Sequence, residues 1–444
     1  MKLRILTSGT PAMRRFMAML LGRRGGTDEG RVNATVAEII AAVRRRGDRA
    51  LLEYTQKFDG VKLTARTLRV TAAEIAAAPG KISARDRRAL ELAARRITRF
   101  HRETLAHGFS FSDDLGMRLG QIVRPLHRVG LYVPGGLGAY PSSVLMNAIP
   151  ARVAGVKEIV MVAPPSREGE RDAVMAAAAI AGVTEYYRVG GAQAVAALAY
   201  GTKTIAPVDK IVGPGNAYVQ AAKRMVYGVA DIDKMAGPSE VLVIADASAR
   251  ADWVAADLIA QAEHGSGDES AILLTPSARV AQEVARALED ALATLPRAAA
   301  VRRVLERRGA AIIVKDLEEA FALSNRIGPE HLELEIKNPR RWLGKVSAAG
   351  AVFLGAMSPA PLGDYLAGPN HVLPTGGSAR FASPLGAYDF LKRTSIIEAS
   401  ARGVRELGPS VARLARMEGF EGHARAIELR SRRHRDAAKP DVRE

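Results

Sequence analysis

Four of the eight histidines in this chain stand in short polar motifs that lie far apart along the sequence. The motifs are Gln261-Ala-Glu-His264, Gly328-Pro-Glu-His331, Gly368-Pro-Asn-His371 and Glu418-Gly-Phe-Glu-Gly-His423. Each motif places an imidazole near a carboxylate or an amide, and such groups together bind metal ions or transfer protons. The clustering therefore predicts a metal site or an acid–base site, with some of these histidines left to purely structural roles.

Two of the motifs contain neighbouring groups that could act together. Gln261 and His264 are three residues apart on a predicted helix, so they share one face and form a workable pair of metal ligands. A helix cap is an equally good interpretation, because Gly265 follows His264. Glu330 and His331 follow a Gly-Pro turn that holds a carboxylate and an imidazole side by side, and both are candidate general bases. A surface turn before a strand explains this second pair equally well.

The remaining polar candidates carry less information by themselves. Asp364 lies in a predicted turn, and His423 lies on a late helix five residues after Glu418. From spacing alone, we expect Asp364 and His423 to be solvated surface residues.

Three glycine-rich turns each follow a predicted strand and precede a predicted helix. They begin at Tyr132-Val-Pro-Gly-Gly, Gly190-Gly-Ala-Gln193 and Gly213-Pro-Gly-Asn216. Glycine lets the backbone approach a ligand closely, and the following helix N-terminus favours an anion. The three turns together favour a nucleotide or another extended ligand, although the G-x-G-x-x-G fingerprint of dinucleotide-binding folds is absent.

The composition excludes several kinds of chemistry. The chain has no cysteine, so it has no disulfide, no thiolate metal ligand and no Cys nucleophile, and a metal must be held by His, carboxylate and amide groups. The formal net charge is +17, but the basic residues are dispersed and aromatics make up only 5% of the chain. We therefore expect an arginine-rich surface and no nucleic-acid partner. No segment approaches the ~18 apolar residues of a membrane span, so we expect a cytoplasmic protein with no membrane contact.

The order of predicted elements indicates an α/β protein of two or three domains. Residues 1–30 are predicted to form an irregular arm, and residues 34–59 and 82–105 form amphipathic helices. From about residue 121 strands and helices alternate, which is typical of open parallel sheets whose ligands bind beyond the carboxyl ends of the strands. After about residue 385 the strand signal fades, residues 404–430 are predicted to be helical, and a charged tail follows.

Several longer motifs connect these candidates to a known family. They are Gly130-Leu-Tyr-Val-Pro-Gly-Gly, Asp209-Lys-Ile-Val-Gly-Pro-Gly-Asn-Ala-Tyr, Ala236-Gly-Pro-Ser-Glu-Val-Leu, Gln261-Ala-Glu-His-Gly, Gly328-Pro-Glu-His-Leu, and Gly363-Asp-Tyr through Gly368-Pro-Asn-His-Val-Leu-Pro-Thr375. On these motifs the chain resembles histidinol dehydrogenase, the NAD-dependent enzyme that ends histidine biosynthesis, over roughly residues 30–430.

The resemblance implies a complete set of site residues. One zinc ion per subunit would be held by Gln261, His264, Asp364 and His423. Substrate contacts would come from these ligands together with Ser239, His331 and Glu418, and the proton-transfer pair would be Glu330 and His331. Contacts to NAD⁺ would fall on Tyr132, Gln193 and Asn216. The match around Glu418 and His423 rests on spacing, and Lys234 stands where an uncharged residue is expected.

The resemblance also implies a fold and a reaction. The fold is two intertwined, incomplete Rossmann-like domains with small N- and C-terminal helical extensions. Residues 1–30 would be the N-terminal arm, 31–131 with 240–384 the first domain, 132–239 the NAD-binding domain, and 385–444 a helical extension that reaches the partner's active site in a homodimer. The substrate would be L-histidinol, oxidised through L-histidinaldehyde to L-histidine as two NAD⁺ are reduced. The alternative is a paralogous zinc- and NAD-dependent alcohol dehydrogenase of the same fold that acts on another small polyol.

Overall fold

The computed structural model describes residues 3–22, 29–135, 139–165, 168–235, 237–263 and 267–431. The chain divides into two compact units, Met1–Thr104 with Leu126–Phe390, and Leu105–Pro125 with Leu391–Glu444. In its described part the first unit contains two six-stranded sheets, and the second contains one three-stranded sheet. No helix in the described ranges is long and apolar enough to cross a lipid bilayer.

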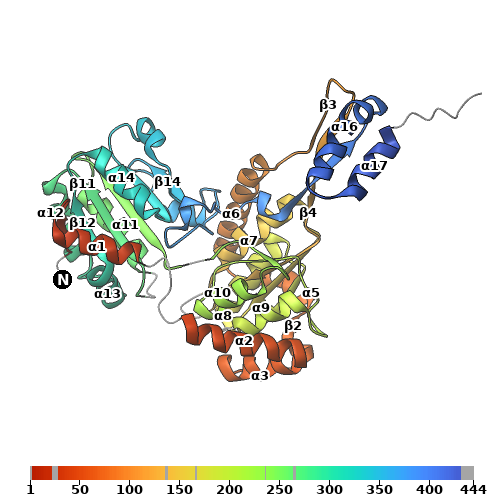
Figure 1. The fold of residues 1–444 in the computed structure, drawn as a ribbon. Coiled ribbons are helices and arrows are strands. Elements are labelled where there is room, and N and C mark those ends of the chain that lie inside the picture. The colour runs from red at the N-terminus through yellow and green to blue at the C-terminus, as the bar shows by residue number, and fades with distance from the viewer. Residues whose placement is uncertain are drawn as a thin grey trace, which may run out of the picture. The chain divides into compact units, whose positions relative to one another are not determined.

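The first sheet is parallel throughout and carries helices on both faces (Figure 1). Its strand order is β1 (Ile5–Thr7), β12 (Gly309–Ile313), β11 (Ser270–Thr275), β10 (Glu240–Ala245), β13 (His331–Glu335) and β14 (Ala351–Leu354). One face packs against α11 (Ala251–Ala262), α12 (Ala278–Ala291) and α13 (Ala298–Arg308). The other face packs against α1 (Pro11–Leu21) and α14 (Leu317–Ile327). Both faces are therefore covered, as expected for a parallel sheet.

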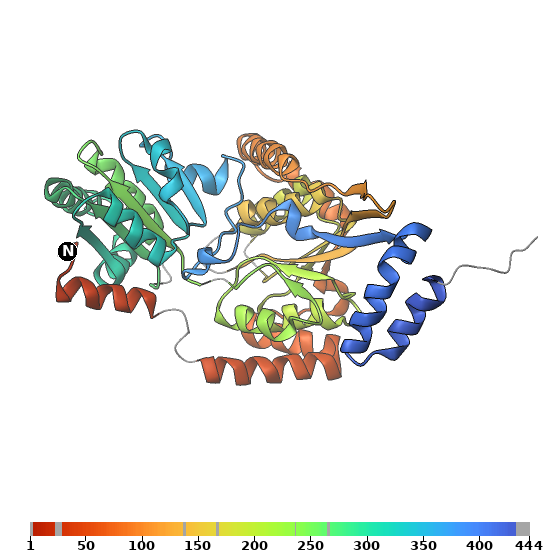
Figure 2. The same ribbon diagram turned by 45° about the horizontal axis from the view of Figure 1, so that its top comes forward.

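The second sheet is parallel except for its short first strand, which pairs antiparallel with its neighbour. Its order is β2 (Arg69–Val70), β7 (Glu185–Arg188), β6 (Glu158–Ala163), β5 (Arg128–Tyr132), β8 (Lys210–Val212) and β9 (Asp231–Ile232). One apolar core joins it to α2 (Glu29–Arg46), α3 (Asp48–Asp59), α9 (Gly191–Tyr200) and α10 (Ala217–Val226). Figure 2 shows α2 and α3 side by side in red and orange below the green helices α9 and α10.

Further helices complete the first unit. Helix α7 (Pro141–Ala154) contacts β5 and β6 and packs against α6 (Ala84–Glu103) and α8 (Glu168–Ala181). Short helices lie in the connections: α4 (Ala65–Leu68), α5 (Ala72–Ala77), η1 (Ala78–Gly80), η2 (Pro339–Lys345), α15 (Ala360–Tyr365), η3 (Ser378–Arg380) and η4 (Ala387–Phe390).

The second unit is built from two segments that are far apart in the sequence. Strands β3 (Phe109–Ser112), β4 (Arg118–Pro125) and β15 (Leu391–Glu398) form an antiparallel sheet with β4 in the centre. Helices α16 (Ala401–Met417) and α17 (Glu421–Ser431) follow and pack against each other as a hairpin.

The α/β architecture with parallel sheets agrees with the sequence prediction, but three boundaries differ. Residues 1–30 are not an irregular arm, because β1 and α1 lie there; a three-residue edge strand is too short to show a period. Residues 31–131 do not belong with 240–384, because α2, α3, β2 and β5 join the sheet of β6–β9. The segment 385–444 is not only helical, since β15 pairs along its length with β4.

Candidate active site

Glu330 and His331 lie at the amino end of β13, immediately after a sharply terminated helix. Helix α14 ends at Ile327, and Gly328 caps it in the left-handed conformation with φ of 64°. A residue other than glycine is strained in that conformation, because its Cβ atom meets the neighbouring backbone. Pro329 then directs the chain into the strand, which begins at His331. The Gly-Pro pair therefore delivers the carboxylate and the imidazole to the strand entrance.

Four of the predicted site residues lie together at this point. The Glu330 carboxylate accepts a hydrogen bond from the backbone N–H of Glu240 at 3.1 Å, and another from the Ser239 side chain. The Nδ1 atom of His331 lies 3.3 Å from the Glu240 carbonyl oxygen and 3.8 Å from Glu330 Oε2. On the other side of the ring, Nε2 lies 3.4 Å from Asp364 Oδ1. Residues distant in sequence thus form one continuous polar cluster.

Burial gives this cluster unusual acid–base properties. Burial raises the pKa of the Glu330 carboxyl above its usual value, although the charge of His331 acts against the rise. For His331 burial alone would lower the pKa, but the Glu330 charge and the Asp364 hydrogen bond outweigh it and raise the pKa to about 9. Burial, followed by the charge of Glu330, also raises the pKa of Glu240 to about 8. Shifts of this kind concentrate at functional sites.

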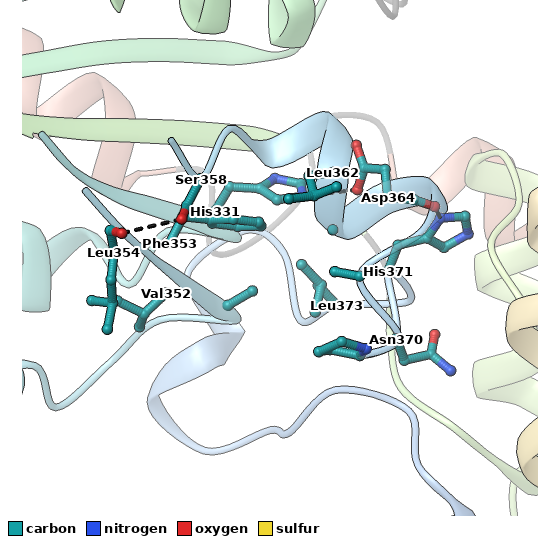
Figure 3. Close-up of a pocket in the computed structure, with 14 residues that line it drawn as sticks. His331, Val352, Phe353, Leu354, Ser358, Leu362, Asp364, Asn370, His371 and Leu373 are labelled. Carbon is teal, nitrogen blue, oxygen red and sulfur yellow. Dashed lines mark hydrogen bonds and ion pairs between the residues drawn. The ribbon is translucent and has the colours of Figure 1, made fainter. Parts of the chain in front are cut away.

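A cavity of about 300 Å³ opens beside His331 between β14, α15 and the chain that follows α15. Figure 3 shows His331 and Asp364 near each other at the cavity wall, with Phe353 next to the imidazole and His371 beyond Asp364. The Nδ1 atom of His371 lies 2.8 Å from the backbone carbonyl of Asp364. The sequence flagged His371 by its motif but assigned it no role; it lines the cavity and contacts the backbone of the residue that carries the carboxylate.

The four predicted zinc ligands are not all assembled within the described residues. Gln261 is 4% exposed near the end of α11, and Asp364 lines the cavity, but His264 falls in residues 264–266, outside the described ranges. His423 lies on α17 and Glu418 caps α16, so both belong to the second unit, where they are exposed. Consistently, the described ranges contain no group of three His, Cys, Asp or Glu residues that could hold a metal ion.

The donor types that are described fit a zinc ion bound by nitrogen and oxygen. Asp364 presents a carboxylate to the cavity wall, the His331 imidazole lies 3.4 Å from it, and Gln261 supplies a buried amide. Imidazole, carboxylate and amide groups without thiolate are a known ligand set for zinc and similar divalent ions. The residues present are therefore compatible with the implied metal.

The three glycine-rich turns meet at one edge of the second sheet. They follow β5, β7 and β8, and because β5, β7 and β8 are parallel to β6 and lie in one sheet, their carboxyl ends share that edge. At Gly213, where φ is 112°, an added Cβ would lie 2.1 Å from the Tyr132 carbonyl oxygen, so only glycine fits. The turns can therefore approach one another closely.

The predicted NAD residues differ in what the structure leaves available for a ligand. Gln193 is 1% exposed, and neither polar atom of its amide has a partner among the described residues. Such an orphaned buried amide fits a polar ligand that would satisfy it. By contrast, the Tyr132 hydroxyl accepts a hydrogen bond from Gly191 N–H at 3.0 Å, and Asn216 caps α10 by accepting from Tyr218 N–H and Val219 N–H. Their visible contacts shape the turns.

The two sets of candidate residues occupy opposite kinds of strand ends. The glycine-rich turns lie at carboxyl ends, as predicted for ligand-binding loops. Ser239, Glu330 and His331 instead lie at the amino ends of β10 and β13, although ligands of parallel sheets are generally expected beyond the carboxyl ends. The physical reason is that the amino ends of adjacent parallel strands also lie side by side. In this sheet the loops that precede β10 and β13 carry the polar side chains.

The parallel sheets and the buried acid–base cluster are those of an α/β enzyme. A family model described as histidinol dehydrogenase matches residues 22–431. Histidinol dehydrogenase of Syntrophotalea carbinolica is 54% identical over 409 residues, covering 92% of this chain and 94% of the relative. That of Moorella thermoacetica is 53% identical over 426 residues, covering 96% and 99%. A crystal structure of histidinol dehydrogenase from Elizabethkingia anophelis matches with a TM-score of 0.90 and 36% identity, covering 96% of this chain and 98% of that chain. The chain belongs to the histidinol dehydrogenase family.

Proposed function

We propose that this chain oxidises L-histidinol through L-histidinaldehyde to L-histidine with reduction of two NAD⁺. The observation that carries the proposal is the cluster of Glu330, His331 and Asp364 in a chain without cysteine. Two different proton transfers are needed, one from an alcohol and one from water, and the cluster supplies two adjacent groups for them. Family membership supports the choice of substrate. The biosynthetic reaction is also the reason for proposing a cytoplasmic location.

We assign the implied zinc ion to Gln261, His264, Asp364 and His423. When bound, zinc would supply a Lewis acid that orients the substrate. Gln261 lies on α11 and Asp364 lies on α15, and both helices belong to the first unit. The relative position of these two proposed zinc ligands therefore depends on how α11 and α15 are held together. Ser239 and Glu418 complete the proposed substrate contacts.

His331 is the proposed acceptor of the hydroxyl proton. A hydrogen bond from Nδ1 to the Glu240 carbonyl selects the tautomer in which Nε2 is the basic atom, and Nε2 faces Asp364 at the cavity wall. The raised pKa means that a proton taken up by the neutral ring is held more tightly than in solution. Only the neutral ring can accept the hydroxyl proton, and because the pKa of His331 is about 9, the neutral fraction increases as the pH rises toward that value.

Glu330 is the proposed base that activates water in the second oxidation. The carboxyl is fully enclosed, and its two hydrogen bonds from Ser239 and Glu240 N–H fix its orientation. The raised pKa makes the carboxylate a stronger base than an exposed one. Many aldehyde oxidations proceed through a cysteine thiohemiacetal, and the absence of cysteine leaves water as the nucleophile.

We assign NAD⁺, the hydride acceptor, to the edge of the second sheet formed by the glycine-rich turns, with contacts from Tyr132, Gln193 and Asn216. The unsatisfied Gln193 amide is the strongest support for this position. We further propose a homodimer in which Glu418 and His423 of the partner subunit complete each site. Leu414, Met417 and Phe420 of the second unit are exposed apolar side chains, and a partner subunit that packs against them would bury them.

The decisive experiment is the NADH yield from a limiting amount of L-histidinol. We expect two NADH per substrate and L-histidine as the only product. A yield of one NADH with release of an aldehyde would exclude the four-electron reaction. Faster turnover of another small polyol than of L-histidinol would instead favour the paralogous alcohol dehydrogenase.

A further inference from the structure

Three carboxylates that the proposed chemistry does not use are buried between the first sheet and α11. Glu333 and Glu335 alternate with leucine along β13, so they face the same side as His331. That side belongs to the core that includes α11, and Asp257 projects from this helix. Glu333 is 2% exposed, and the other two are also buried. Buried carboxylates are costly unless they are hydrogen-bonded, so their contacts require an explanation.

Glu333 contacts two elements besides its own strand. Its Oε1 atom accepts a hydrogen bond from the backbone N–H of Ala360 at 2.6 Å, and Ala360 is the first residue of α15. Its side chain also lies within hydrogen-bonding reach of the Asp257 carboxyl on α11, and the two carboxyls influence each other's pKa. Among the described residues no N–H or O–H group donates to Glu333 Oε2, so the Asp257 carboxyl is the polar neighbour left to satisfy it when one of the two carboxyls holds a proton. Two carboxyl groups can hydrogen-bond to each other only when one of them holds a proton.

The surroundings place that proton on Glu333. Burial, followed by the charge of Asp257, raises the pKa of Glu333 to about 8. Burial also raises the pKa of Asp257, and the hydrogen bond from Glu333 acts against that rise, as expected for the accepting partner. The groups that face Glu333 are Asp257 on α11, His331 and Glu335 on its own strand, the Ala360 N–H on α15, and the apolar neighbours Val243 on β10 and Phe353 on β14.

The three elements that meet at Glu333 each carry a residue of the candidate site. Strand β13 carries His331 two residues earlier, and α15 carries Asp364 four residues after Ala360. Helix α11 carries Gln261 one turn after Asp257, on the same face. We propose that Glu333, paired with Asp257, is a positioning residue that joins β13, α15 and α11 and so sets the geometry of the metal and proton-transfer site. This inference rests on the proposed function, and it assigns to Glu333 the role of holding together the three elements that carry the site.

If Glu333 positions the metal ligands, its replacement should weaken zinc binding, as it does for other residues that orient metal ligands. Loss of such a partner typically weakens metal affinity by about 10- to 100-fold without removing a ligand. Glu333→Met should show this effect, because methionine fills a similar volume but accepts no hydrogen bond from Ala360 and donates none to Asp257. Glu333→Gln should resemble the wild type, because its amide oxygen can accept from Ala360 and its NH₂ can donate to Asp257.

Zinc retention is the first measurement. The zinc-loaded homodimer is titrated with a chelator, and the chelator concentration that removes half of the zinc is compared among variants. We expect Glu333→Met to lose zinc at about 10- to 100-fold lower chelator concentration, and Glu333→Gln to stay within about threefold of wild type. Glu335→Met is the matched control, because Glu335 is buried on the same face of β13 and, within the described residues, no hydrogen bond or ion pair joins its side chain to α15. We expect that control to retain zinc like the wild type.

Amide hydrogen exchange in the metal-free protein is the second measurement, and it does not depend on activity. The folded pKa of Glu333 lies above its ordinary value of 4.5, so the stabilisation from its proton is fully present below about pH 4.5 and is lost as the pH rises through about 8. Ionisation of Glu333 ends its donation to Asp257 but strengthens the bond from Ala360 N–H, so protection of residues 257–261 of α11 should fall between pH 6 and about 9 in the wild type. In Glu333→Gln the protection should stay constant over that range.

The outcomes separate this inference from the function on which it rests. If the wild type neither binds zinc nor oxidises L-histidinol, the proposed function fails. If the wild type does both and Glu333→Met retains zinc equally well, the positioning role is wrong. The role is also wrong if Glu333→Gln is as impaired as Glu333→Met, since the two hydrogen bonds would then not be the cause.

Discussion

A buried ion pair that holds one glycine-rich turn provides the sharpest test of how the second sheet is stabilised. The side chains of Lys223 and Asp233 are 0% and 1% exposed and form a direct ion pair. Lys223 Nζ also donates to the Gly213 carbonyl at 2.9 Å, and the Gly213 N–H donates to Asp233 Oδ2 at 2.9 Å. Both backbone groups of Gly213 are therefore tied to the pair, which fixes the turn that begins there.

Lys223→Met removes one partner and leaves the buried Asp233 carboxylate and the Gly213 carbonyl without it. Breaking a buried ion pair from one side typically costs about 3–5 kcal/mol, most of it from the uncompensated charge. The double variant Lys223→Met/Asp233→Asn removes both charges and keeps an acceptor for the Gly213 N–H. It should recover about 1–3 kcal/mol of that loss, since coupled neighbours are not additive.

Chemical denaturation of the single and double variants measures these free energies of unfolding, and amide exchange at residues 213–216 reports the turn itself. Lys203→Met is the control, because Lys203 is exposed in the same unit and should change stability by no more than about 0.5 kcal/mol. If the turn binds NAD⁺, the KM for NAD⁺ should rise in Lys223→Met while zinc content stays constant. A loss below about 1 kcal/mol, or a double variant no more stable than the single one, would refute the reasoning.

Three further outcomes test the proposed function. Glu330→Gln should slow oxidation of supplied L-histidinaldehyde by about 10²–10⁴-fold and slow the alcohol step far less, because the base is assigned to water activation alone; equal slowing of both steps would contradict that assignment. His264→Asn should purify with little zinc by metal analysis, and an unchanged zinc content would remove His264 from the ligand set. Mixing the inactive variants His264→Asn and His423→Ala should restore activity after subunit exchange, because one site of each mixed dimer would then be intact. If tagged subunits exchange and the mixture stays inactive, the site is not shared between subunits.

The sequence by itself determined the class of fold and the chemical character of the site. Alternation of strand and helix patterns requires crossover connections, and those connections produce parallel sheets. The adjacent Glu330 and His331 were identifiable as an acid–base pair because the chain joins them directly and a Gly-Pro turn precedes them. The absence of cysteine excluded a thiol mechanism without any knowledge of the fold.

Only the tertiary structure decided how these parts are shared and supported. Strands β1, β2 and β15 each pair with a strand that is distant in the sequence, so local patterns could not predict them. The same holds for the sheet that residues 29–104 join. Along β13 the sequence His-Leu-Glu-Leu-Glu alternates as a strand with one solvent face would, yet every residue is buried. Burial depends on α11 covering that face, a long-range packing event. That packing buries Glu333 beside Asp257 and raises the pKa of its carboxyl, which a solvent-exposed glutamate on the same strand would not show.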